Sequence, residues 1–233
     1  MLPFAPILLA LVYGLIAYRF SVWRTARDLD ARSAPLADRE VMRLVERMAG
    51  ALGLERIAVH IYEVATVNGL AAPDGRIFLT RGFYEQFRQG RVTAEELAGV
   101  VAHELGHVAL GHARRRMIDF SGQNAIRMAL AGVLSRVLPG VGALIAAGLT
   151  SLLAARLSRQ DEFEADAYAS ALLVKAGIGV APQVSLFCKL EALTGAPGAG
   201  TSAWLLSHPR TTDRISAIEA RAARWRGDTA RLR

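Results

Sequence analysis

The sequence predicts a mainly helical α+β fold that contains a small β-sheet and follows an N-terminal transmembrane helix. Residues 36–52 place apolar side chains at the i, i+3, i+4 and i+7 spacing of an amphipathic helix. Residues 57–64 are rich in β-branched and aromatic types, which favour a strand. Residues 66–71 and 76–80 flank the turn sequence Ala72-Pro73-Asp74-Gly75 and predict a β-hairpin.

More helices are expected along the rest of the chain. Thr93 and Glu96 have the spacing of a capping box, which predicts that a helix begins at Ala94. The expected helices cover residues 94–117, 158–175, 182–195 and 212–225. We divide the chain into a membrane anchor (1–23), a single domain (24–225) and a basic tail (226–233).

The composition favours a membrane surface over nucleic acid as the partner. Apolar residues make up 52% of the chain, and the net charge of +7 comes mostly from arginine. Aromatic residues make up 7% and do not alternate with the basic ones, so we predict no nucleic-acid partner. Cys188 is the single cysteine, which excludes an internal disulfide and a cysteine-based zinc site; we expect it to be buried on a helix.

Residues 2–18 carry no charged side chain and predict an uncleaved membrane anchor. As a helix they would span about 25 Å, close to the roughly 30 Å of a bilayer core. A signal peptide is the competing interpretation, but no basic segment precedes the run and no clear cleavage site follows it. Arg19, Arg24 and Arg27 follow the run, which places the domain on the cytoplasmic side of a bacterial inner membrane, with the periplasm as the alternative.

Residues His103 to His107 form the pattern H-E-x-x-H within the helix expected over 94–117. Two imidazoles four positions apart are offset by about 40° around a helix, so both can bind one ion. Glu104 is placed to take a proton from a metal-bound water. The pattern therefore predicts a zinc site with Glu104 as the general base.

A catalytic zinc site also needs a third protein ligand and an open position for water. His112 is a poor candidate, because it lies five residues after His107 and about 140° around the same helix. We expect His112 to be structural or exposed, and to face away from the site.

The better candidate for the third ligand is Glu162, which shares a helical face with Asp166. A carboxylate ligand followed one turn later by a carboxylate that holds a ligand histidine is the gluzincin arrangement. We expect Asp161 and Glu164 to point into solvent. Spacing alone leaves Glu164 open as the ligand, and a purely structural carboxylate pair remains an alternative.

The second apolar stretch, residues 137–155, lies between His107 and Glu162. A single membrane crossing there would put two ligands of one ion on opposite sides of the bilayer. We therefore expect an apolar helical arm over 121–157 that packs on the protein or lies at the membrane interface. A transmembrane hairpin is the second choice, because it would carry Arg127 and Arg136 into lipid at a cost of about 2.5–3.5 kcal/mol each.

Four separated elements of the chain resemble the zinc metalloproteases of the HtpX and CAAX-prenyl endopeptidase family, and especially its compact BepA-like and LoiP-like members. The similar elements lie at residues 68–82, 103–107, 158–166 and 208–215. The later two, S-R-x-x-E-F-x-A-D and H-P-x-x-x-x-R-I, are more specific than H-E-x-x-H. The chain departs from the family pattern at Leu70, where an aromatic residue is usual, and this bears on substrate fit.

The resemblance implies a gluzincin metallopeptidase domain that binds one Zn²⁺ per chain. It implies that Glu162 is the third ligand beside His103 and His107, and that Asp166 supports a ligand histidine. His208 would stabilise the oxyanion or cap the zinc, and Arg214 would support the loop that carries His208.

The resemblance also implies that residues 76–80 form an edge strand to which an extended polypeptide substrate adds. The residues assigned to substrate binding are Asn68, Ile77, Phe78 and Leu79. The expected function is a zinc-dependent endopeptidase for quality control of membrane or envelope proteins. The alternative is a chaperone-like envelope assembly factor whose zinc site is largely plugged. The expected lipid contacts are residues 2–18 and, as a further option, 137–155.

Overall fold

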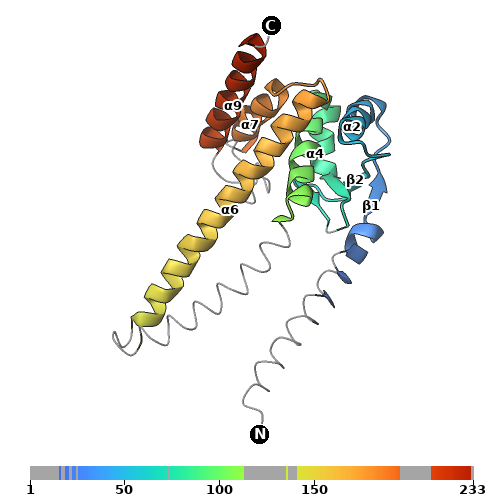
Figure 1. The fold of residues 1–233 in the computed structure, drawn as a ribbon. Helices are drawn as coiled ribbons and strands as arrows, with labels where there is room; N and C mark the ends of the chain where they lie inside the picture. Colours follow the sequence, from blue (N-terminus) through green and yellow to red (C-terminus); the bar gives the residue numbers. More distant parts are fainter. Residues whose placement is uncertain are drawn as a thin grey trace.

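The computed structural model describes a domain of helices around a small sheet, together with isolated positions before it (Figure 1). The described residues are Ile16, Arg19, Phe20, Trp23, Arg24, Ser135 and the ranges 26–72, 74–112, 141–194 and 211–231. The predicted anchor, the predicted hairpin partner before residue 137, and His208 fall wholly or almost wholly outside these residues.

The sheet has four strands in the order β1-β2-β4-β3. They are β1 (Ser33–Pro35), β2 (Val59–Tyr62), β3 (Gly69–Ala71) and β4 (Ile77–Thr80). β2 and β4 are parallel, whereas β1 pairs with β2, and β3 with β4, in the antiparallel direction. The predicted hairpin is confirmed, and its turn closes where the N–H of Gly75 donates to the carbonyl of Ala72 at 3.0 Å.

The expectation that residues 76–80 form an edge strand is wrong. β4 lies inside the sheet, with β2 on one side and β3 on the other. Its residues Ile77, Phe78 and Leu79 are fully buried, as expected of a short apolar strand that is covered on both faces. Because the sequence predicted the hairpin but not the parallel pairing with β2, it could not tell which hairpin strand was the edge. Among the described strands, the edges are β1 and β3.

Helix α2 (Arg39–Leu52) covers the predicted amphipathic segment but begins three residues later than predicted. Asp38 caps it, because its side chain accepts hydrogen bonds from the N–H groups of Glu40 and Val41. The predicted apolar stripe is buried except at its end, where Leu52 is partly buried. Helix α3 (Arg81–Arg88) was not predicted; it follows β4 directly and is capped by Thr80.

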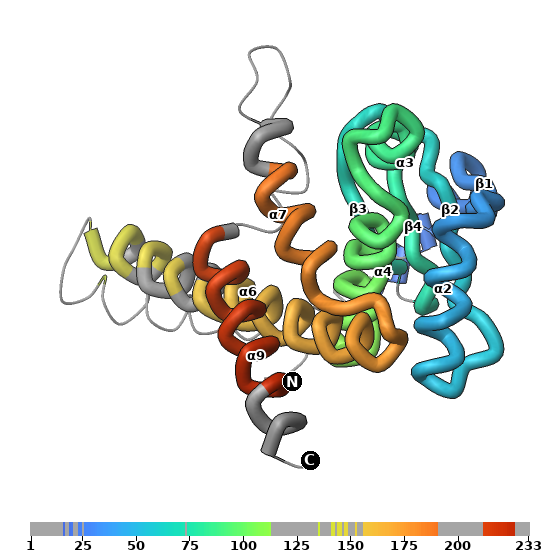
Figure 2. Tube along the Cα trace, turned by 90° about the horizontal axis from the view of Figure 1, so that it is seen from above, coloured from blue at the N-terminus to red at the C-terminus, as the bar shows by residue number. Residues whose placement is uncertain are grey.

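Helix α4 (Ala94–Ala109) is central, since it contacts α2, α6, α7, β3 and β4 (Figure 2). It begins at the predicted residue, and the predicted capping box of Thr93 and Glu96 is present. It ends at Ala109 rather than at Met117, because Gly111 has a φ of 66° that interrupts the helix. This early end redirects the chain toward the site described below.

Helix α6 (Gly142–Lys175) is one continuous helix of 34 residues, so the apolar arm and the carboxylate helix are not separate elements. Its first half extends away from the rest of the domain, and Leu144 and Leu152 there are 72% and 70% exposed (Figure 1). None of the described helices is both long enough and apolar enough to cross a membrane.

The two remaining helices, α7 (Ala181–Thr194) and α9 (Thr211–Arg231), pack on each other and on neighbouring helices. α7 contacts α4, and α9 contacts α6. α9 continues past Trp225 to Arg231, so the predicted tail is largely helical. Cys188 is on a helix, as expected, but is exposed rather than buried.

Candidate metal centre

The centre forms where α4 and α6 come close together. A Cβ atom at Gly106 would lie 3.0 Å from both the Cα and the carbonyl oxygen of Ala165, closer than most packed Cβ atoms come to their neighbours. The two small residues therefore let the helix backbones approach each other at this point. This approach brings the H-E-x-x-H segment of α4 next to Glu162 and Asp166 of α6.

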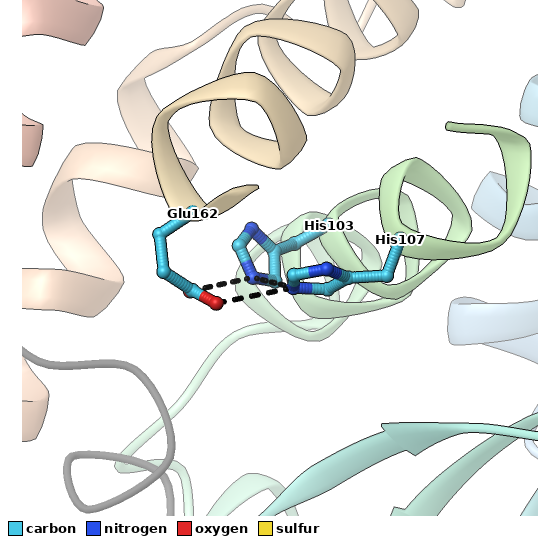
Figure 3. Close-up of side chains that lie close together, drawn as sticks. All are labelled: His103, His107 and Glu162. Carbon is cyan, nitrogen blue, oxygen red and sulfur yellow. Dashed lines mark hydrogen bonds and ion pairs between the residues drawn. The ribbon is translucent and has the colours of Figure 1, made fainter. Parts of the chain in front are cut away.

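Three side chains converge at this contact: His103, His107 and Glu162 (Figure 3). The Nε2 atoms of the two histidines are 3.1 Å apart. The Glu162 oxygens lie 3.4 Å from Nε2 of His103 and 3.5 Å from Nε2 of His107. Ligands bound at about 2.0–2.1 Å to a tetrahedral ion lie roughly 3.3 Å from one another. The two ring nitrogens and the Glu162 carboxylate therefore have the spacing of three ligands of one tetrahedral ion, which would leave its fourth position to water.

Asp166 and Arg214 form the second layer of the centre. Oδ1 of Asp166 lies 2.9 Å from Nδ1 of His103, the nitrogen that does not face Glu162. The Arg214 guanidinium donates to both carboxylate oxygens of Asp166, from Nε at 2.6 Å and from Nη2 at 2.7 Å. Its Nη1 is 3.4 Å from Oε2 of Glu162. Arg214 thus joins the candidate ligand to the residue that orients His103.

Arg214 is 1% exposed, and its guanidinium lies over the ring of Phe187 at 4.5 Å. A charge so deeply buried needs partners, and here the two carboxylates of α6 supply them. The resemblance assigned Arg214 to the loop that carries His208. That loop is outside the described residues, and the contact with Asp166 and Glu162 is one that the sequence did not predict.

The pKa values of the paired groups reflect these contacts. Burial alone would lower the pKa of His103, but hydrogen bonds with Asp166 and Glu162 outweigh burial and raise it to about 9. Burial would raise the pKa of Asp166, yet hydrogen bonds from Arg214 and His103 bring it down to about 2. Asp166 is therefore ionised at neutral pH. A metal ion at His103 competes with a proton, so its affinity falls as the pH is lowered.

Glu104 lies on α4 between the two histidines and is 3% exposed. Its negative charge acts, together with the larger effects of Asp166 and Glu162, to raise the pKa of Arg214. This position, beside the ligands but not among them, is where a general base would act on a water molecule in the fourth position.

A second group of side chains lies next to the centre, where the sequence predicted none. His112 is 1% exposed, and its Nδ1 lies 2.8 Å from Nδ1 of His107, so it does not face away from the site. Its Nε2 is 3.3 Å from Glu164 and 3.8 Å from Asp161. Asp161 is buried rather than solvated, and Glu164 contacts His112.

The residues assigned to substrate binding lie on and before the hairpin. The N–H of Asn68 donates to Oγ1 of Thr80 at 2.9 Å, so Asn68 is held against the end of β4. Ile77, Phe78 and Leu79 occupy the interior strand. β3 contacts α4, so its outer edge is the strand edge nearest the metal helix.

The fold and the site define a metallopeptidase of the H-E-x-x-H type with a glutamate from a second helix. The model of peptidase family M48 matches residues 35–222 of the chain. The chain belongs to peptidase family M48 and is a metalloprotease of that family.

Individual relatives agree with this assignment. Metalloprotease LoiP of Escherichia coli K12 is 31% identical over 202 residues, which cover 83% of this chain and 75% of LoiP. Metalloprotease YcaL of the same strain is 33% identical over 166 residues, covering 70% of this chain and 61% of YcaL. A protease HtpX homolog of Bordetella avium is 28% identical over 236 residues, covering 88% of this chain and 79% of that protein.

Proposed function

We propose that the chain is a zinc-dependent endopeptidase that cleaves membrane or envelope proteins. The observation that carries this proposal is the convergence of His103, His107 and Glu162, whose ligand atoms lie within 4.8 Å of one another. Two imidazoles and one carboxylate form the ligand set of many catalytic zinc sites. Zinc in this position would polarise a peptide carbonyl and lower the pKa of a bound water.

Glu104 is the general base in this proposal. It accepts a proton from the attacking water and passes it to the nitrogen of the departing amine. Its burial favours this exchange, because a carboxylate away from bulk water does not lose the proton to solvent. Asp166 and Arg214 keep His103 and Glu162 in place while the proton moves.

The substrate in this proposal adds to β3 rather than to β4. Across the hairpin, the N–H of Thr80 donates to the carbonyl of Asn68, and the N–H of Ala72 donates to the carbonyl of Arg76. By the alternation of antiparallel pairs, the N–H and C=O groups of Gly69 and Ala71 point to the opposite side. An extended polypeptide can pair with these groups beside α4, which supports cleavage of unfolded or extended segments.

The test is the variant Glu104→Gln, compared with Glu95→Gln, the same change on the same helix outside the centre. We expect Glu104→Gln to keep stoichiometric zinc but to cleave casein at least about a hundred-fold more slowly. Glu95→Gln should cleave at the wild-type rate. Near-normal cleavage by zinc-loaded Glu104→Gln would disprove the role of Glu104.

A lipid surface is part of the proposal. Ile16, Phe20 and Trp23 are all more than half exposed, and so are Leu144 and Leu152 of α6. Leu144 and Leu152 belong to the first half of α6, which extends away from the sheet (Figure 1). Their arrangement supports attachment to a bacterial inner membrane, with the domain in the cytoplasm as the arginine flank predicts and the periplasm as the alternative.

A further inference from the structure

The two candidate histidine ligands are supported in different ways. His103 turns its Nδ1 to the Asp166 carboxylate, at 2.9 Å. His107 turns its Nδ1 to another histidine, His112, at 2.8 Å. Metal-bound histidines generally donate their second ring N–H to an acceptor that fixes the ring and increases its basicity. His112 occupies that place for His107.

The backbone explains how His112 reaches this place. In an uninterrupted helix it would lie about 140° away from His107. Instead α4 ends at Ala109, and Gly111 adopts a φ of 66°. This change of backbone direction brings His112 back to the face of α4 that carries His107. The rings of His107 and His112 meet edge to face, with centroids 4.9 Å apart and planes inclined at 72°. At 1% exposure His112 is closed off from water.

The hydrogen count between the two rings determines the direction of the contact. If Nε2 of neutral His107 binds the ion, its Nδ1 carries the hydrogen and donates. Nδ1 of His112 then has to be the acceptor, so the hydrogen of His112 is on Nε2. That nitrogen faces Oε2 of Glu164 at 3.3 Å and Oδ1 of Asp161 at 3.8 Å. Each ring thus donates to the next group, and the series ends on a carboxylate.

We propose that His112 is a positioning residue for the metal ligand His107, held in turn by Glu164 and Asp161 of α6. The inference rests on the proposed zinc site. His112, Glu164 and Asp161 thus support the candidate zinc ligands. His107 is held by a histidine, whereas His103 is held directly by a carboxylate. The role of His112 is to keep Nε2 of His107 directed at the ion.

The same group could be taken for a second metal site, because its three ligand atoms lie within 4.8 Å of one another. Metal on Nε2 of a neutral His112 would leave the hydrogen on its Nδ1. Two N–H groups would then point at each other across the 2.8 Å gap between His107 and His112. The two sites cannot both be filled by neutral imidazoles in this geometry. We therefore expect one ion per chain.

The test compares His112→Leu with His112→Asn in the full chain. Asn keeps an acceptor oxygen close to the position of Nδ1, whereas Leu keeps none. We expect His112→Leu to weaken zinc binding about 10–100-fold in competition with a chromophoric chelator, and His112→Asn to restore most of the affinity. The visible spectrum of the cobalt-substituted protein should change in His112→Leu and stay near wild type in His112→Asn. His60→Leu and His60→Asn are the matched controls, at a histidine of β2 stacked on Phe78.

Several outcomes would overturn the inference. Equal losses in His112→Leu and His112→Asn, or wild-type affinity and spectrum in both, would show that the acceptor is irrelevant. Two zinc ions per wild-type chain, with one lost in His112→Leu, would make the group a metal site. Nitrogen-15 spectra of the zinc-loaded wild type give an answer even where a variant fails to fold, since they show which ring nitrogen of His112 carries hydrogen. A wild-type chain without stoichiometric zinc would instead sink the proposed function itself.

Discussion

The two halves of α6 have opposite compositions and opposite environments. The half from Ser158 to Lys175 carries the charged residues Asp161, Glu162 and Asp166, all of which are buried. The half before Ser158 is mostly apolar, yet Leu144 and Leu152 are the most exposed large apolar side chains among the described residues. In a helix surrounded by water the arrangement would be reversed. The inner half buries charge at the candidate metal centre, and the outer half exposes leucine to surroundings that we propose to be lipid.

The largest effect is expected at Glu162 in the inner half. Glu162→Ala removes one of three candidate ligands, so we expect zinc binding to fall by more than the roughly 10–100-fold typical of losing a ligand's supporting partner. Metal content after dialysis measures it. Glu164→Ala is the matched control, two residues along the same helix, and should retain zinc. Loss of zinc in Glu164→Ala but not in Glu162→Ala would mean that the wrong carboxylate was chosen.

The sequence predicted the elements of the candidate metal centre well because their signals are local. The capping box of Thr93 and Glu96 placed the start of α4, and H-E-x-x-H placed two side chains on one face of it. The i, i+4 spacing placed Glu162 and Asp166 together. Which carboxylate approaches the histidines depends on the close contact of Gly106 with Ala165. These two residues lie 59 positions apart in the sequence, a separation that no local pattern reports.

Other features depended on long-range contacts and were missed or placed wrongly. The pairing of β4 with β2 decides which strand is the edge, and neither strand's composition encodes it. The two hydrogen bonds from Arg214 to Asp166 join α9 to α6, and the sequence did not predict them. His112 was expected to face away because the prediction continued the helix through Gly111. A glycine four residues after His107 was the one signal that could have ended that helix earlier.

The next largest effect is on stability. It is measured by the same change, leucine to alanine, in the inner and in the outer half of α6. Leu173 is fully buried in the inner half, so Leu173→Ala should lower the free energy of unfolding by about 2–5 kcal/mol. Leu152→Ala should lower it by only about 0.5 kcal/mol or less, since the side chain leaves no cavity. Denaturant unfolding of zinc-loaded protein measures both. Equal losses would mean that the outer half packs against the protein, which contradicts the lipid contact.

The smallest effect on the fold, and the sharpest test of the outer half, comes from single labelled cysteines. In a Cys188→Ser background, Leu152→Cys and Val174→Cys place an environment-sensitive dye at exposed positions in the outer and inner halves of the same helix. With vesicles of anionic phospholipid, we expect the dye at position 152 to shift to the blue and to be quenched by lipid-borne quenchers. The dye at position 174, 46% exposed at the opposite end of the helix, should remain in water. If the two dyes respond alike, the proposal that only the outer half of α6 contacts lipid is wrong.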